Sequence, residues 1–200
     1  MQHLARIGRS PRLIVALLLA AVGLTLCGQG TYIHAKALLA QILLEKAFTR
    51  SISTGKQEKP WSWADTWPVA RITVPRLGAS AIALAGASGQ ALAFGPGHVP
   101  STPEAGEAGT AVYAAHRDTH FAFLRDIATG DLIAVTRADG TTHRFRVVGT
   151  SIVRWDGSGL DPAAPGRHLV LATCWPFNAR TAGPWRFLVH ADTAETPAAD

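Results

Sequence analysis

The chain has 200 residues, of which 48% are hydrophobic, enough for one packed domain and a short additional segment. Its net charge of +5 is modest, and its arginines are scattered rather than interleaved with aromatic residues, so nucleic-acid binding has little support. Of the two cysteines, Cys27 falls in an apolar stretch expected in lipid, and Cys174 in the part expected to fold in water. If that part is exported, Cys174 is an unpaired thiol in an oxidising setting and a candidate reactive group.

The N-terminal segment has the pattern of a membrane anchor. Arg6, Arg9 and Arg12 precede an apolar run, and no charged residue follows until Lys36. An uncharged span of about twenty residues matches the hydrocarbon thickness of a bilayer when it is helical. Arginines on its N-terminal side favour a cytoplasmic N-terminus and an exported remainder. We therefore expect residues 1–34 to form a cytoplasmic tip and an uncleaved transmembrane signal anchor, with a cleaved signal peptide as the alternative.

The next segment connects this anchor to the folded part of the chain. Apolar residues recur at helical spacing from Ala35 to Phe48, which predicts an amphipathic helix that continues off the membrane. The polar stretch from Thr49 to Pro60 predicts a linker, so residues 35–60 are assigned to a helix and linker. The segment Trp61–Pro68 then contains three tryptophans. These favour a packing lid or contact with lipid headgroups over an aromatic binding platform.

Short apolar or alternating stretches, separated by glycine and proline, predict β-strands from residue 69 onward. The predicted strands are Val69–Val74, Ala79–Leu84, Thr110–Ala115, Asp131–Arg137, Thr142–Val148, Leu169–Thr173 and Trp185–His190. Many short strands without strand–helix alternation indicate a mostly β protein, an antiparallel barrel or sandwich. We assign residues 61–192 to this folded domain and residues 193–200 to a flexible tail.

Cys174 is the first candidate for chemistry, because it stands where a buried strand ends before Pro176. Most free cysteines are small buried hydrophobes, which is the alternative interpretation. A thiol nucleophile needs a base or cation beside it, since the thiolate is the reactive form. His116 is the best candidate because it ends an apolar strand and opens a polar turn. His120 in the following loop stays possible, and Asp118 is near enough in sequence to be considered as a carboxylate partner.

A carbonyl oxygen that becomes negative during reaction needs a cation or hydrogen-bond donor. Arg186 lies in the strand that follows the Cys174 loop, so a hairpin-like return brings it beside the cysteine. The alternative for Arg186 is an ion pair with a surface carboxylate. Arg180 also follows Cys174, but it lies in a polar loop where its position is expected to be loosely held. The spacing of cysteines and histidines is not that of a metal site, and no glycine-rich phosphate loop is present, so we predict no metal and no cofactor.

Three ordered motifs resemble those of sortases. Ala115–Thr119 resembles the family's histidine motif, Leu171–Cys174 its Thr-Leu-any-Thr-Cys motif, and Pro184–Phe187 the arginine strand that follows. The resemblance covers about Val69 to Ala191, and three motifs in the same order as in the family argue against a chance match. Among sortases, the chain looks closest to class D and to the marine proteobacterial group called class GN. The segment Trp61–Pro68 is similar to the corresponding segment of that group.

The resemblance implies a sortase-like closed, mostly antiparallel β-barrel with short helices. It also implies a single-pass tether to the inner (cell) membrane, with the catalytic domain in the periplasm. The implied activity is cysteine transpeptidation: cleavage of a Leu-Pro-any-Thr-Gly-like sorting signal through a thioacyl-enzyme, then transfer of the exported protein to an amine acceptor. The identity of that amine and any dependence on calcium stay open.

Under this resemblance each candidate residue has an implied role. Cys174 is the nucleophile, His116 protonates the departing amine, and Arg186 holds the substrate or the oxyanion. The secondary candidates for substrate binding are Thr173, Asp118 and His120. Two other functions stay open from the residues alone. One is another thiol-dependent envelope transpeptidase or peptidase, and the other is a non-catalytic membrane-anchored assembly module in which Cys174 is merely buried.

Overall fold

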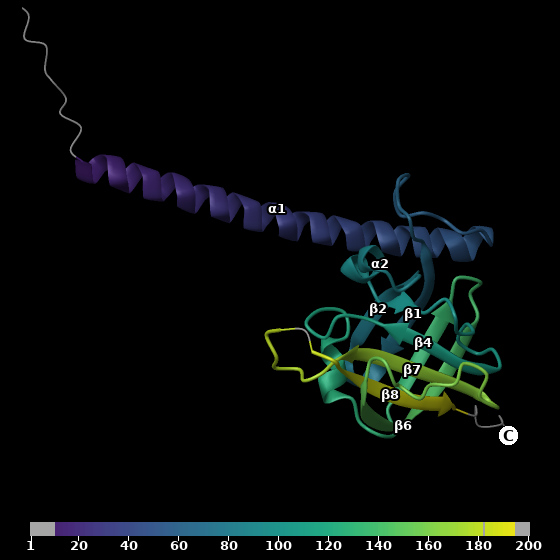
Figure 1. Cartoon of the computed structure of the whole chain (residues 1–200). Coiled ribbons are helices and arrows are strands. Elements are labelled where there is room, and N and C mark those ends of the chain that lie inside the picture. Colours follow the sequence, from purple (N-terminus) through teal and green to yellow (C-terminus); the bar gives the residue numbers. More distant parts are fainter. Residues whose placement is uncertain (1–10, 182, 195–200) are drawn as a thin grey trace, which may run out of the picture. The chain divides into compact units, whose positions relative to one another are not determined.

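The computed structural model describes residues 11–181 and 183–194, and the chain divides into two compact units, Met1–Ala40 and Gln41–Asp200. One α-helix, α1 (Pro11–Thr54), supplies residues 11–40 of the first unit and residues 41–54 of the second (Figure 1). The predicted cytoplasmic tip before residue 11 and the predicted tail after residue 194 lie outside the described residues. The boundaries drawn from the sequence at residues 34, 60 and 192 stay predictions.

In the first unit, α1 exposes large apolar side chains from Leu13 to Leu39. Exposed apolar surface is unfavourable in water, whereas a helix of this length can cross the hydrocarbon core of a bilayer. Among the described residues, α1 is the one helix long and apolar enough to span a membrane, a property that a signal sequence near an N-terminus shares. The helix is therefore consistent with the predicted single-pass anchor.

Within the described part of the second unit, eight strands form a closed barrel in the order β1-β2-β3-β4-β7-β8-β6-β5 (Figure 1). The strands are β1 (Pro68–Val74), β2 (Ala79–Ala85), β3 (Gly97–His98), β4 (Gly109–Ala114), β5 (Leu132–Arg137), β6 (Thr142–Arg154), β7 (Arg167–Cys174) and β8 (Trp185–Thr193). The short helices between them are η1 (Pro75–Leu77), α2 (Gly89–Phe94) and η2 (Ala122–Asp126). A closed, mostly antiparallel barrel with short helices confirms the predicted fold class.

The core fills the inside of the barrel because apolar residues alternate along its strands. In β1, for example, every second residue from Pro68 to Val74 is buried. The largest fully buried core side chains include Tyr113, Phe121, Phe145, Leu169 and Leu171. Each such side chain stabilises the fold by about 1.5–3 kcal/mol through its removal from water. β4 is buried along almost its whole length, since Val112 on its outer side packs against Val170 and Leu188.

Two of the eight strand pairings in the described barrel are parallel, β2 with β3 and β4 with β7. The other six are antiparallel. Parallel partners need a long connection, and here everything between β4 and β7, including β5 and β6, serves as that connection. Nothing in the sequence indicated the parallel pairing of β4 with β7, which decides at which edge of the barrel the functional side chains lie.

The last turns of α1 pack on the barrel through one face. Leu44 and Phe48 are fully buried in a cluster that includes Ile82 and Leu84, and the amide nitrogen of Gln41 donates to the Phe94 carbonyl at 2.8 Å. This burial at helical spacing agrees with the predicted amphipathic helix. The helix continues beyond Phe48 and ends at Thr54, where the amide of Gly55 donates to the carbonyl of Ser51 at 2.9 Å. With φ of +66°, Gly55 adopts the left-handed conformation that commonly ends a helix.

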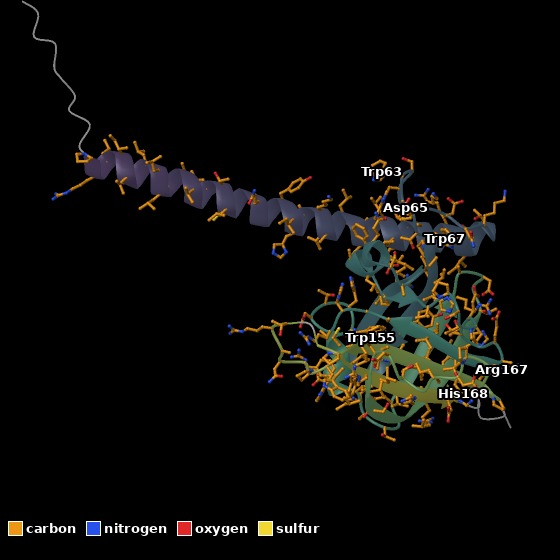
Figure 2. The ribbon with its side chains drawn as sticks, viewed as in Figure 1. Trp63, Asp65, Trp67, Trp155, Arg167 and His168 are labelled. Atoms are coloured by element: carbon orange, nitrogen blue, oxygen red, sulfur yellow. The ribbon has the colours of Figure 1, made fainter. Side chains whose placement is uncertain are left out.

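Ring contacts outside the site involve two further segments. His98 belongs to strand β3, and its half-buried ring lies 5.1 Å from that of Tyr113. Of the three tryptophans after the linker, Trp61 packs edge-on against Phe94 at 5.0 Å, whereas Trp63 is 79% exposed (Figure 2). The packing expectation for this segment therefore fits Trp61.

Candidate active site

The ends of β4 and β7 lie at the same edge of the barrel because these two strands run parallel. Their ladder ends with Ala114 opposite Ala172, and the amide of Ala115 donates to the carbonyl of Ala172 at 3.1 Å. Continued by two residues, this register sets His116 beside Cys174. Neighbouring strands lie about 4.8 Å apart, so an imidazole and a thiol at these two positions are within reach of each other.

On the other side of β7, the antiparallel pairing with β8 sets Arg186 directly opposite Cys174. Side chains opposite each other in such a pair have Cβ atoms about 5 Å apart. Cys174 therefore stands between the segment that carries His116 and the strand that carries Arg186. The strand register therefore places the three residues predicted to be catalytic at one edge of the barrel, although they come from three different strands or strand ends.

The three side chains differ in how firmly they are held. Cys174 is a half-buried free thiol, and His116 is exposed. In the described part of the chain, no hydrogen bond holds the His116 ring. Arg186 is half-buried, and its Nη1 donates to the carbonyls of Gly183 and Trp185 at 2.9 Å each. These two bonds hold the guanidinium through one nitrogen, and within the described residues no hydrogen bond engages its Nε or Nη2.

Thr173, a secondary candidate for substrate contact, is buried with 2% of its surface exposed. Its hydroxyl donates to the carbonyl of Ala115 at 2.8 Å, just before His116. A contact between Thr173 and substrate stays a prediction. The hydrogen bond points to a second role, joining the ends of β4 and β7 directly below His116 and Cys174.

The other secondary candidates lie in the turn after β4. His120 is half-buried, and burial together with the nearby charge of His116 lowers the pKa of His120 below its ordinary value. The charge of His116 therefore acts on His120 at this edge of the barrel. The carboxylate of Asp118 is 68% exposed and lies 3.5 Å from the Nε of Arg117. It interacts with that arginine rather than orienting His116.

A family model described as a sortase domain matches residues 72–194, which is more than half of the chain. The chain belongs to the sortase family. As a sortase it is a cysteine transpeptidase, and its eight-stranded closed barrel is the sortase fold. It is also similar to sortase D of Bacillus subtilis (strain 168), with 23% identity over 191 residues that cover 88% of this chain and 96% of that protein.

Solved sortases share this fold. Sortase C-1 from Actinomyces oris is 25% identical, with 64% of this chain and 75% of that chain covered and a TM-score of 0.57. A sortase D5 transpeptidase of Clostridium perfringens is 16% identical, with coverages of 78% and 99% and a TM-score of 0.62. Sortase A from Corynebacterium diphtheriae is 22% identical, with coverages of 80% and 86% and a TM-score of 0.60.

In this sortase, an aromatic cluster that the sequence analysis missed follows the cysteine. The rings of Trp175 and Phe187 stack with centroids 5.7 Å apart, and Phe177 packs edge-on against Phe187 at 5.2 Å. Arg125 covers the outer face of Phe177 with its guanidinium carbon 5.7 Å from the ring centre. These contacts give the loop after Cys174 an apolar base. The signal that could have found them is the density of aromatic residues in the sequence Trp175-Pro176-Phe177.

Arg117 was also missed as a functional candidate of the sortase site. It was read only as part of a polar turn, yet it is buried with 5% of its surface exposed and donates to carbonyls of the loop after Cys174. Its position next to His116 is the only sequence signal that could have drawn attention to it. Among the described residues of this sortase, no group of three or more His, Cys, Asp or Glu is placed to hold a metal ion.

Proposed function

We propose that this sortase is a membrane-anchored transpeptidase that cleaves a Leu-Pro-any-Thr-Gly-like sorting signal and transfers the exported protein to an amine. The observation that carries the proposal is the position of Cys174 between His116 and Arg186 at one edge of the barrel. The combination offers a nucleophile, a proton donor and a cation for a developing oxyanion, which together suit acyl transfer.

In the proposed first half-reaction, the sulfur of Cys174 attacks the carbonyl carbon of the Thr-Gly bond. The available nitrogens of Arg186 donate to the carbonyl oxygen as it becomes negative. Collapse of the tetrahedral species breaks the carbon–nitrogen bond, and His116 gives its proton to the departing amine. The acyl group is then held on Cys174 as a thioester.

In the second half-reaction, an incoming primary amine attacks the thioester carbonyl. His116, neutral after the first step, takes the proton of that amine, and the new amide leaves with Cys174 restored as the thiolate. Because the first product departs before the second substrate reacts, the kinetics are ping-pong. Water can replace the amine, which gives slow hydrolysis.

The proposed location is the inner membrane, with a single-pass anchor, a cytoplasmic N-terminus and the barrel in the periplasm. The exposed apolar surface of α1 supports the anchor, and the arginines before it support the orientation. The similarity to sortase D supports a class D relationship. The finer assignment to class GN rests on the segment Trp61–Pro68. The expected partner is an exported protein with a C-terminal sorting signal.

The test uses the full-length protein in detergent with a fluorogenic Leu-Pro-Ala-Thr-Gly peptide and a primary amine. We expect cleavage between Thr and Gly, an acyl adduct on Cys174 by mass spectrometry, and an amide product with the added amine. Cys174→Ala should abolish all three, because it removes the attacking sulfur. Cys27→Ala is the matched control and should keep full activity, since Cys27 lies in the anchor.

Each alternative function predicts a different outcome of this test. Strong cleavage by Cys174→Ala would refute the mechanism. Cross-linking of peptidoglycan fragments without cleavage of the sorting peptide would identify another envelope transpeptidase. No acylation, together with very slow alkylation of Cys174 by iodoacetamide, would identify a non-catalytic assembly module.

A further inference from the structure

Arg117 directly follows His116 in the chain, but its side chain turns inward while that of His116 stays exposed. Its Nη1 donates to the carbonyl of Pro176 at 2.9 Å. Its Nη2 donates to the carbonyl of Ala179 and, at 3.2 Å, to that of Thr181. All three acceptors belong to the loop between Cys174 and β8. One guanidinium therefore links the turn that carries His116 to the loop that begins at Cys174.

This link begins where the sheet can no longer hold the two segments together. The last backbone bond between them joins Ala115 to Ala172, and the Thr173 hydroxyl bonds to the Ala115 carbonyl. Beyond these two bonds, all the hydrogen bonds that the described residues make between the histidine turn and the cysteine loop come from Arg117. Beyond the end of the sheet, Arg117 therefore supplies the hydrogen-bonded connection between these two segments.

The choice of arginine fits this task. A planar guanidinium can donate to several carbonyls in a fixed arrangement, whereas a lysine ammonium is a point charge on a flexible stem. The carboxylate of Asp118 lies 3.5 Å from the Nε of Arg117, but it is exposed, so water screens this ion pair. The buried guanidinium is therefore stabilised mostly by the dipoles of the carbonyls to which it donates. That Nε is buried and makes no hydrogen bond in the described structure. A buried cation of this kind is costly unless its remaining contacts are well formed, so the loop carbonyls are drawn into one geometry.

We propose that Arg117 is a positioning residue that sets the distance between His116 and Cys174 by fixing the loop after the cysteine to the histidine turn. The inference rests on the proposed function of the same site. Acyl transfer requires the reacting groups to be held at a defined distance and orientation, and a displacement of about 1 Å can lower the rate about a hundredfold. Arg117 touches no reacting atom, so its loss should slow the chemistry and leave peptide binding nearly unchanged.

The matched control is Arg137, a second arginine with little exposure and an unbonded buried Nε. It forms ion pairs with Glu104, Glu107 and Asp139. It lies at the end of β5, which pairs with the start of β6, whereas the far end of β6 pairs with β8 near Arg186. Loss of Arg137 therefore tests what removal of a structural arginine does at a distance from the site.

The experiment compares Arg117→Lys, Arg117→Gln and Arg137→Gln in full-length protein that carries Cys27→Ala. Thermal midpoint, kcat and KM for the sorting peptide are measured for each variant. We expect kcat to fall at least about tenfold in both Arg117 variants, with KM changed less than about threefold. Arg137→Gln should lower the thermal midpoint and keep kcat within about twofold. If Arg117→Gln does not fold, Arg117→Lys decides, and a wild-type kcat in that variant would overturn the proposal.

A second measurement needs no peptide and so separates this inference from the proposed function. The rate of alkylation of Cys174 by iodoacetamide reports on the thiolate that the neighbouring imidazole supports. We expect this rate in the Arg117 variants to fall toward that of His116→Ala and to stay unchanged in Arg137→Gln. If wild type does not cleave the peptide, the proposed function fails while this comparison still tests Arg117. Wild-type alkylation in both Arg117 variants, or a rise in KM alone, would refute the positioning role.

Discussion

A histidine lies at each end of β7, and the two imidazole rings differ in their hydrogen bonding. At the first end, Nδ1 of His168 lies 2.7 Å from an Asp192 carboxylate oxygen and Nε2 lies 2.8 Å from the Pro165 carbonyl. Both partners are acceptors, so both ring nitrogens can donate only when the ring is protonated. At the last end, His116 stands beside Cys174 with its ring exposed and held by no hydrogen bond in the described chain.

The comparison shows what distinguishes a structural histidine from one free to exchange protons. A surface hollow of about 570 Å³ at the first end of β7 is lined by His168, Asp192 and neighbouring residues. Both ring nitrogens of His168 are nevertheless occupied by hydrogen bonds within the protein. The Pro165 carbonyl and, to a smaller extent, the Asp192 carboxylate raise the pKa of His168 and favour its charged form. No hydrogen bond in the described chain holds the ring of His116, which suits its proposed role of giving a proton to one amine and accepting one from the next. A hollow and a histidine together do not make a catalytic site.

The largest expected effect separates the two histidines directly. His116→Ala should lose peptide cleavage across about pH 5–9, because it removes the group proposed to protonate the leaving amine. His168→Ala should keep most activity, and so should His120→Ala. The measurement is kcat/KM over this range, for which the wild type should give a bell-shaped profile. If His120→Ala were as inactive as His116→Ala, the proton donor would be His120.

A smaller effect is expected from the two arginines that follow Cys174. Arg186 is held opposite the cysteine by β8 and by two carbonyls, whereas Arg180 is exposed in the loop. Loss of one pre-positioned oxyanion donor costs about a hundredfold or more, so Arg186→Lys and Arg186→Ala should lose most turnover. Arg180→Ala should lose only a few-fold. Steady-state cleavage with the opposite order would assign the role to Arg180.

The smallest effect concerns stability at the first end of β7. Since the pKa of His168 is raised in the folded protein, its ion pair stabilises the fold fully below the ordinary value of 6.5. This contribution is lost as pH rises above 6.5 and through the raised pKa. The pair is partly exposed, so Asp192→Asn should cost only about 0.2–1 kcal/mol near pH 6 and less at higher pH. Denaturant unfolding at several pH values measures this, and a cost that grew with pH would contradict the assignment.

Much of the barrel could be predicted because its signals are local in the sequence. Alternating and apolar stretches indicated each of the long strands, and the sequences around His116, Cys174 and Arg186 each carry a short motif. β6 was expected to end at Val148 but continues to Arg154, because its second half pairs with β8 rather than β5. Its far end could not be found from periodicity alone, since the partner that supports it lies much later in the chain.

The contacts that assemble the site depend on distant partners and so were not predictable. Nothing in the sequence of β4 indicates that it pairs in parallel with β7, and that pairing directs the end of β4, which precedes His116, to the same edge as Cys174. Nothing in the polar turn after His116 indicated that Arg117 is buried. Its burial requires the loop carbonyls of Pro176, Ala179 and Thr181, whose direction is set by folding of the whole loop.

The closed ring of strands restricts how a peptide can approach the thiol. β7 is hydrogen-bonded to β4 on one side and to β8 on the other, so it has no free edge on which an extended peptide could be added as another strand. A peptide that reaches Cys174 must instead be bound at the edge of the barrel by side chains and by the backbone of the loops. Selectivity then resides in the loops at this edge of the barrel, some of which also bury core side chains such as Phe121. Exchange of these loops between related enzymes should therefore transfer peptide preference and keep stability only where such buried side chains are retained.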